Sequence, residues 1–193
     1  MAAKPGRMTA DRVKREVYSL WLMPSGKLAI QLRTLIAKLS NEYLTPTFEP
    51  HVTLIGELNL PKATVIARTK KLAAQTEPFE VKLSQVANLD RYFRCVFIKA
   101  HNTKGLMNAY SAARVLFEQE NAEKYIPHLS LVYGNLKSHT RQSIIRDIGE
   151  KMDVGFSAKE IYLYYTGGQP HDWRRVSIIP CSSHGSAIQF GQK

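Results

Sequence analysis

A six-residue pattern occurs twice in this sequence of 193 residues, as PHVTLI at positions 50–55 and as PHLSLV at positions 127–132. Each copy alternates as a short β-strand does, so a histidine and the hydroxyl residue two positions later share one side, and aliphatic residues face the other. A proline before each histidine suits the first residue of a strand, where a missing N–H does little harm. The four polar side chains are those of His51, Thr53, His128 and Ser130.

Two imidazoles that face one cleft can divide the work of acid–base catalysis. Near neutral pH one takes a proton from a nucleophile while the other, protonated, gives a proton to a leaving oxygen. The two hydroxyls can hold the non-bridging oxygens of a phosphate, which predicts in-line displacement at phosphorus. Neither hydroxyl needs to be a nucleophile, because no carboxylate stands beside either motif in the sequence. Our hypothesis gives water activation to His128 and protonation of the leaving oxygen to His51, with the reverse assignment open.

Two other interpretations of the histidines compete with this one. Either could be an ordinary half-buried residue at the start of a strand, but the duplication of the whole pattern disfavours this. A metal site is the second alternative, yet no His-x-x-x-His or Cys-x-x-Cys spacing is present. We therefore expect no metal and no other cofactor. The remaining histidines are His101, His139, His171 and His184.

The elements that must position the motifs have a similar order in the two halves of the chain. Periodicity and turn residues predict strands and helices with these bounds: strand 16–23, helix 27–40, strand 51–58, a helix from Pro61 to about 76, strands 79–87 and 94–100, helix 103–117, the second motif strand, helix 138–152, and strands 158–166 and 174–180. The expected fold class is α+β, with two pseudo-symmetric lobes of antiparallel sheet backed by helices around a central cleft.

Composition and charge limit the class of protein. The net charge of +11 favours a phosphate-bearing partner, either a nucleotide or a polymer. We expect a basic tail over 1–15, one bilobal domain over 16–181 and a second tail over 182–193. No apolar run is long enough for a membrane span, and the first residues lack the apolar core of a secretory signal. A cytoplasmic monomer is expected, with Cys95 a small buried thiol rather than half of a disulfide.

The paired motifs, in an α+β chain of this size, resemble the 2H phosphoesterase superfamily, and most of all its plant and fungal cyclic phosphodiesterases. The resemblance covers roughly residues 16 to 181. It rests on Pro50–Leu54, on Pro127–Leu131 with Tyr133 three residues after the serine, and on the run Tyr92–Phe97.

This resemblance implies hydrolysis of ADP-ribose 1″,2″-cyclic phosphate to the 1″-phosphate. It also implies hydrolysis of nucleoside 2′,3′-cyclic phosphates to 2′-phosphates, as in the disposal of a by-product of tRNA splicing. No metal takes part in that scheme. Tyr133 would join the phosphate site, although its strand parity is opposite to that of Ser130, so its phenol reaches the cleft only where the strand twists or bulges.

Further residues are candidates for nucleotide contacts. Tyr18 and Trp21, on the first predicted strand, could stack a base, although a strand tryptophan is more often part of the core. Arg91 and Arg94 could meet a second phosphate at the rim of the cleft, and the indole of Trp173 could form a wall of the cleft.

Two other functions stay open on the sequence alone. A 2H-type RNA end-processing phosphodiesterase or 2′-5′ RNA ligase would use the same histidines on a polymer, and the basic charge supports that interpretation. A non-catalytic nucleotide-binding module would keep the fold but tolerate loss of a histidine, whereas both histidines are present.

Overall fold

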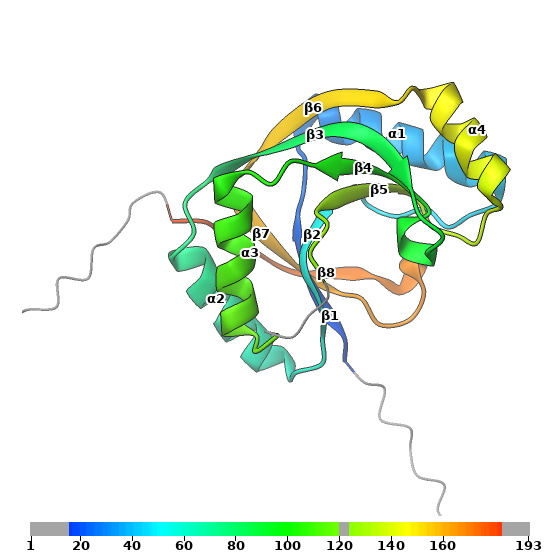
Figure 1. Ribbon diagram of the computed structural model, residues 1–193. Helices are drawn as coiled ribbons and strands as arrows, with labels where there is room; N and C mark the ends of the chain where they lie inside the picture. Colours follow the sequence, from blue (N-terminus) through cyan, green and yellow to red (C-terminus); the bar gives the residue numbers. More distant parts are fainter. Residues whose placement is uncertain (1–15, 120–123, 183–193) are drawn as a thin grey trace, which may run out of the picture.

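The computed structural model describes residues 16–119 and 124–182, which form one curled antiparallel sheet of eight strands flanked by four α-helices (Figure 1). The predicted tail over 1–15 lies outside the described residues, as does the predicted tail over 182–193 apart from Ser182. The strands are β1 (Tyr18–Leu22), β2 (Val52–Leu58), β3 (Phe79–Asn88), β4 (Val96–Ala100), β5 (His128–Val132), β6 (Lys151–Ala158), β7 (Glu160–Tyr165) and β8 (Arg174–Pro180). The helices are α1 (Gly26–Tyr43), α2 (Lys62–Ala74), α3 (Lys104–Leu116) and α4 (Ser138–Ile148).

The strand order brings the two motifs together. Neighbouring strands follow the order β6-β3-β4-β5-β2-β1-β7-β8, and every pair is antiparallel. Strands β2 and β5 are therefore central, and each begins at its histidine motif. They meet at a single register pair, Val52 with Leu129, the residues directly after His51 and His128. Each half of the sheet has four strands, and the site lies where the halves join.

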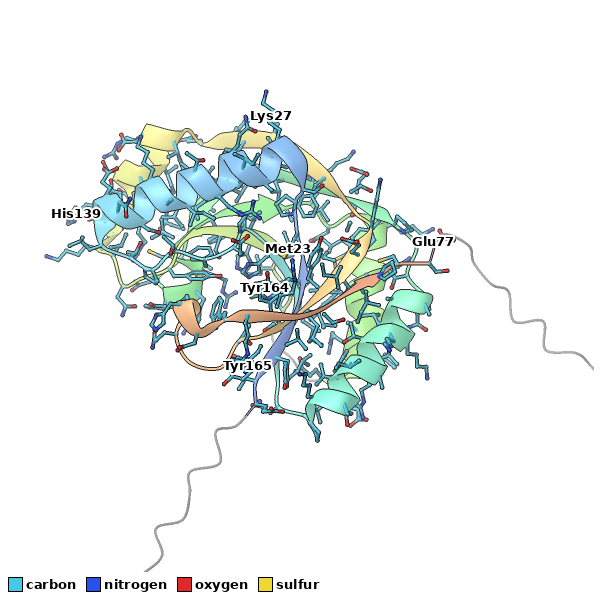
Figure 2. All side chains as sticks on the ribbon, turned by 180° about the vertical axis from the view of Figure 1, so that it is seen from behind. Met23, Lys27, Glu77, His139, Tyr164 and Tyr165 are labelled. Atoms are coloured by element: carbon cyan, nitrogen blue, oxygen red, sulfur yellow. The ribbon has the colours of Figure 1, made fainter. Side chains whose placement is uncertain are left out.

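The two halves are related by an approximate two-fold axis, as the sequence predicts. However, one helix from each half packs on the strands of the other half. Helix α1 follows β1 yet packs on β5 of the other half, and α3 follows β4 yet packs on β2. Helix α2 covers β7 and β8, and α4 covers β3 and β4. Figures 1 and 2 place α2 and α3 on one flank and α1 and α4 on the other. The predicted α+β class is confirmed, with one continuous antiparallel sheet serving both lobes.

Strand alternation sends the aliphatic residues of both motifs into the core. Val52, Leu54, Leu129 and Leu131 are each at most 1% exposed, which leaves the histidine side of each strand for the cleft. Both cysteine thiols are buried and free, as expected for Cys95. Among the described residues, no helix combines the length and apolar character that a membrane crossing requires.

Helix α1 runs to Tyr43, three residues past its predicted end, and two other predicted boundaries are wrong for local reasons. Helix α4 ends at Ile148 instead of 152, because Gly149 adopts φ of +92° and breaks the helical path. Met152 then belongs to β6, a strand that was not predicted and that pairs with β3. In addition, β4 begins at Val96, since the preceding Tyr92–Arg94 forms a 3₁₀ turn. The predicted hairpin between β3 and β4 is present.

Candidate active site

A cleft of about 400 Å³ lies over the junction of β2 and β5 and is lined by both motifs. All four predicted polar residues of the motifs reach it, although they come from positions far apart in the chain. The lining residues are Val17, Ser19, Trp21, His51, Thr53, Gly56, Glu57, Phe93, Arg94, His128, Ser130, Tyr133, Thr166 and Trp173.

Both histidines are held in the same way by the backbone. The Nδ1 atom of His51 lies 2.6 Å from the carbonyl oxygen of Glu49, and Nδ1 of His128 lies 2.7 Å from that of Ile126. In each copy the carbonyl belongs to the residue two positions earlier. A carbonyl can only accept, so Nδ1 carries the proton and the neutral ring keeps Nε2 as its basic atom. The two imidazoles therefore offer the cleft the same nitrogen in the same tautomer.

His51 is the more deeply buried of the two. The residue is 6% exposed, and its ring stacks on the indole of Trp21, with centroids 3.6 Å apart and planes 8° apart. Desolvation lowers the pKa of His51 to about 3, against a smaller rise from the bond to the Glu49 carbonyl and a further lowering by the charge of His128. His51 is thus a neutral base throughout the physiological pH range.

His128 sits in wetter surroundings. The ring is only partly buried and meets Phe97 edge-on, with centroids 5.1 Å apart and planes 65° apart. Burial lowers the pKa of His128, the bond to the Ile126 carbonyl opposes this, and the positive charge of Arg94 lowers it further. An anion bound beside Arg94 would offset that charge and favour the protonated ring.

The two hydroxyls differ in what they already bind. The Ser130 hydroxyl donates to the carbonyl of Phe93 at 2.9 Å. No hydrogen bond is made by the Thr53 hydroxyl to any residue in 16–119 or 124–182, while the Thr53 carbonyl accepts from the phenol of Tyr125 at 2.9 Å. Thr53 therefore has its donor available to a ligand, whereas Ser130 first has to release the Phe93 carbonyl.

Aromatic residues gather at the end of the cleft where β5 finishes. Strand β5 ends at Val132, so strand parity no longer applies at Tyr133, and its side chain lines the cleft as the resemblance implies. Its ring stacks on Phe48, with centroids 3.7 Å apart, and its neighbours include Phe93 and Trp173 at 5.2 and 5.9 Å. Burial raises the pKa of Tyr133, opposed by its hydrogen bond with Ser130, so the phenol keeps its proton.

The remaining predicted contacts are divided between cleft and core. Tyr18 is 2% exposed and packs edge-on against Tyr165, which leaves no face for a base. Trp21 lines the cleft, but His51 covers one face and Tyr164 the other, so the indole supports a histidine instead of stacking a nucleotide. Arg94 and Trp173 line the cleft, as the sequence predicts. Arg91 is exposed and lines neither this cleft nor the cavity beside it.

The cleft also has lining residues that were not among the predicted site residues, and Phe93 and Glu57 are two of them. Phe93 is 53% exposed at the cleft and offers an aromatic face beside Trp173, with centroids 6.0 Å apart. Glu57 lies in the first motif strand, beyond the repeated pattern. The signal that could have located it is Gly56, because a glycine inside a strand pattern often marks a bulge.

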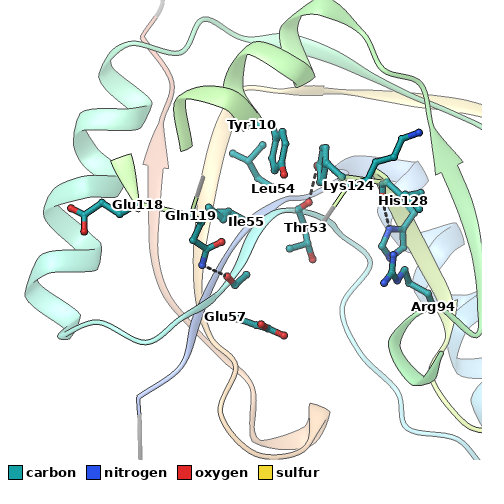
Figure 3. Close-up of a pocket in the computed structure, with 13 residues that line it drawn as sticks. Thr53, Leu54, Ile55, Glu57, Arg94, Tyr110, Glu118, Gln119, Lys124 and His128 are labelled. Carbon is teal, nitrogen blue, oxygen red and sulfur yellow. Dashed lines mark hydrogen bonds between the residues drawn. The ribbon is translucent and has the colours of Figure 1, made fainter. Parts of the chain in front are cut away.

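A second cavity, of about 640 Å³, adjoins the first on the side of α3 (Figure 3). The two cavities share Thr53, Gly56, Glu57, Arg94 and His128. The second cavity is lined in addition by Leu54, Ile55, Tyr110, Glu118, Gln119, Lys124, Tyr125 and Ile126. The motifs thus stand at the junction of two connected spaces.

The described part of the chain contains no group of three or more His, Cys, Asp or Glu side chains placed to hold a metal ion. Each motif histidine has already committed Nδ1 to a carbonyl, which leaves one nitrogen per ring for any other role. Independence from metal remains a prediction.

The fold matches that of solved structures. It matches Escherichia coli LigT in complex with NADP⁺ with a TM-score of 0.62 and 11% identity, covering 88% of this chain and 99% of that one. It matches TT0787 of Thermus thermophilus with a TM-score of 0.63 and 14% identity, covering 85% and 97%. The chain therefore has the LigT-like 2H phosphoesterase fold, and the predicted fold is confirmed.

Sequence comparison gives the family. The model of the family described as cyclic phosphodiesterase-like protein matches residues 17–185, so the chain belongs to that family. A cyclic phosphodiesterase of Arabidopsis thaliana is 26% identical over 133 residues, which cover 69% of this chain and 74% of the relative. A 2′,3′-cyclic-nucleotide 3′-phosphodiesterase of Phaeosphaeria nodorum is 32% identical over 180 residues, which cover 84% and 90%. The chain is therefore a phosphodiesterase.

Proposed function

We propose that this enzyme hydrolyses nucleoside 2′,3′-cyclic phosphates to 2′-phosphates, and ADP-ribose 1″,2″-cyclic phosphate to the 1″-phosphate, without a metal ion. The observation that carries the proposal is the matched anchoring of His51 and His128 across one 400 Å³ cleft, each with Nδ1 bound to a carbonyl. The name of the fungal relative, a 3′-phosphodiesterase, supports cleavage of the bond to O3′.

The burial of the two rings supports an assignment of roles opposite to our sequence-based hypothesis. His51 has the deeper environment and a pKa of about 3, so it serves as the base that takes a proton from water at Nε2. His128, beside Arg94, serves as the acid. Water oxygen bonds to phosphorus, the bond from phosphorus to O3′ breaks, and O3′ receives the proton from Nε2 of His128. Proton exchange with solvent then restores both rings.

Charge on the pentavalent transition state needs hydrogen-bond donors and cations. The Thr53 hydroxyl, the Arg94 guanidinium and the protonated His128 can supply them without a metal. Ser130 contributes as a donor when its hydroxyl turns from the Phe93 carbonyl. The aromatic end with Phe93 and Trp173 suits a nucleobase, and among the described residues the buried indole Nε1 of Trp173 has no hydrogen-bond partner to compete with such a ligand.

A second candidate function is the processing of RNA ends. The 640 Å³ cavity next to the motifs favours it, because a further nucleotide could occupy that space beside Lys124 and Arg94.

The test compares three substrates side by side: adenosine 2′,3′-cyclic phosphate, ADP-ribose 1″,2″-cyclic phosphate and an oligonucleotide with a 2′,3′-cyclic phosphate end. We expect turnover of the first two to persist after dialysis against a chelator, with a 2′-phosphate as the nucleoside product. Loss of activity with chelator and its rescue by one divalent ion would refute the metal-free mechanism. Strong preference for the oligonucleotide would favour the second candidate.

A further inference from the structure

Glu57 has a backbone conformation that is unusual for its place in the fold. Among the described residues, three non-glycine positions have positive φ: Leu44, Glu57 and Glu118. Leu44 and Glu118 follow the ends of α1 and α3, where the left-handed conformation is common. Glu57, with φ of +57°, lies inside β2, where a residue with a side chain incurs a steric cost for it. Such a cost in a cleft invites a functional explanation.

The surrounding structure holds this conformation in place. Thr53 lies opposite Trp21, but Leu58 lies opposite Tyr18, so β2 has two more residues than β1 over this stretch and bulges. The carbonyl of Gly56 accepts a hydrogen bond from the Gln119 side chain at 3.0 Å, and the carbonyl of Glu57 accepts one from the Asn59 side chain at 2.9 Å. A Cβ at Gly56 would lie 3.3 Å from the Ser19 hydroxyl, so glycine permits the close approach.

The bulge delivers Glu57 to the passage between the two cavities, because the residue lines both. Figure 3 shows its side chain in the opening, with Arg94 and His128 across from it. Strands β2 and β5 are antiparallel, so Glu57 lies beyond the motifs in one direction and the aromatic end with Tyr133 lies beyond them in the other. A base stacked at the aromatic end therefore lies on the opposite side of the motifs from Glu57, whereas a chain that enters the second cavity passes beside it.

The negative charge of Glu57 is unfavourable in a site that binds phosphate. It is the one carboxylate among the described residues that line the first cavity. Glu118, in the second cavity, is neutralised by an ion pair with Arg68 at 2.8 Å, whereas no described residue forms an ion pair with Glu57. A carboxylate accepts hydrogen bonds but repels anions, so each additional phosphate that comes near it raises the energy of the complex.

We propose that Glu57 is a specificity-determining residue that keeps polyanionic chains out of the second cavity, so that the enzyme favours small cyclic phosphates over oligonucleotides with a cyclic phosphate end. This inference rests on the proposed function and specifies its substrate class. Without the carboxylate, a 640 Å³ cavity with Lys124 and Arg94 at its wall would accept another nucleotide. The attractive contacts alone would bind both the cyclic mononucleotide and the oligonucleotide. Repulsion by Glu57 disfavours the oligonucleotide and so makes the enzyme selective.

The experiment measures kcat/KM of wild type, Glu57→Gln and Glu57→Lys for three substrates with increasing numbers of additional phosphates. These are adenosine 2′,3′-cyclic phosphate, ADP-ribose 1″,2″-cyclic phosphate and a short oligonucleotide with a cyclic phosphate end. In Glu57→Lys at low ionic strength, the ratio of oligonucleotide to mononucleotide kcat/KM should rise about ten-fold, with a smaller rise for Glu57→Gln and for ADP-ribose cyclic phosphate. At about 1 M salt the rise should largely disappear.

Glu77→Lys is the matched control, since it makes the same change of charge at an exposed position that lines neither cavity. It should leave the ratio unchanged. Glu57→Gly removes the charge together with the backbone strain and should raise the ratio as Gln does. A ratio that stays constant across all Glu57 variants would overturn the proposal, as would an equal rise in Glu77→Lys.

Binding separates this inference from the proposed function. A fluorescent oligonucleotide with an unreactive 2′-phosphate end reports affinity without turnover, and Glu57→Lys should bind it about ten-fold more tightly than wild type at low salt. If wild type fails to hydrolyse the cyclic mononucleotide, the proposed function is wrong while this measurement still decides the role of Glu57. Equal affinity of both proteins for the oligonucleotide would count against the exclusion.

Discussion

The two copies of the motif share a sequence pattern and an anchoring bond but have different surroundings. At the start of β2, His51 is 6% exposed and lies flat against Trp21. At the start of β5, His128 is partly exposed, meets Phe97 edge-on and faces the charge of Arg94. Their hydroxyls also differ, because the Ser130 hydroxyl donates to a carbonyl, whereas the Thr53 hydroxyl has no hydrogen-bond partner among the described residues.

The different surroundings of the two histidines explain how a duplicated motif can catalyse a reaction that needs one base and one acid. Hydrolysis needs one ring that is neutral and one that is protonated, and identical environments would give both rings the same proton affinity. Desolvation of His51 separates the two, since it penalises the charged ring more in the drier copy. The catalytic asymmetry therefore comes from the packing around each copy and not from the motif itself.

The largest effect should follow removal of either ring. His51→Ala and His128→Ala should each lower turnover of adenosine 2′,3′-cyclic phosphate by about 10² to 10⁴-fold, because each loses one proton-transfer role. His139→Ala, at an exposed position on α4 (Figure 2), is the control and should match wild type. Retention of more than about a tenth of the wild-type rate by one variant would remove that histidine from the mechanism.

Removal of the two hydroxyls should have different effects. Loss of the Thr53 hydroxyl should lower activity alone, whereas loss of the Ser130 hydroxyl should lower stability as well. Thr53→Val should lower kcat/KM by about 10 to 100-fold with little loss of stability, because its hydroxyl is available to the phosphate. Ser130→Ala should also lower the free energy of unfolding by about 0.5 to 1.5 kcal/mol, because the buried Ser130 hydroxyl no longer donates to the carbonyl of Phe93. Denaturant titration and steady-state kinetics of both variants check this. Equal losses of stability would contradict the distinction.

A smaller change in rate, with a shift in pH dependence, should result from Trp21→Phe. The smaller ring covers His51 less completely, so the pKa of His51 should rise from about 3 toward its ordinary value. The acid limb of the profile of kcat/KM against pH should then move to higher pH, and kcat should fall by about ten-fold through poorer positioning of the ring. An acid limb that does not move would show that the stacked indole does not set the proton affinity of the base.

The last effect concerns stability alone. The folded pKa of His51 lies below the unfolded value of 6.5, so between about 3 and 6.5 the unfolded chain binds the proton more strongly. The contribution of His51 to stability is complete above pH 6.5 and is lost progressively as the pH falls toward 3. The difference between the denaturant midpoints of wild type and His51→Gln should therefore be smaller at about pH 4 than at about pH 7. A constant difference would mean that His51 does not titrate on unfolding.

The sequence predicted the parts of the site that depend on local pattern. Strand parity and the repeated pattern correctly placed His51, Thr53, His128 and Ser130 in one cleft, and the aliphatic residues of the motifs in the core. These inferences need only the period of a strand and the similarity of two segments.

The parts that depend on distant pairing could not be predicted in the same way. The stacking of Trp21 between His51 and Tyr164 joins three strands, and nothing near Trp21 in the sequence indicates that both faces are covered. The placement of Glu57 depends on the bulge opposite β1. Strand β6 was missed because the helical pattern of apolar residues continues through Met152, although the helix itself ends before Gly149.

The crossed packing of α1 on β5 and of α3 on β2 has a consequence for how the molecule folds. Each half of the sheet obtains part of its apolar cover from a helix that belongs in sequence to the other half. Neither half can complete its core alone, so the protein should unfold in one cooperative transition, and a fragment ending after β3 should not fold. The same arrangement makes most of the stabilising contacts distant in sequence, which predicts slow folding compared with a helical protein of this length. The two histidines are consequently brought together only at the end of a single, all-or-none process.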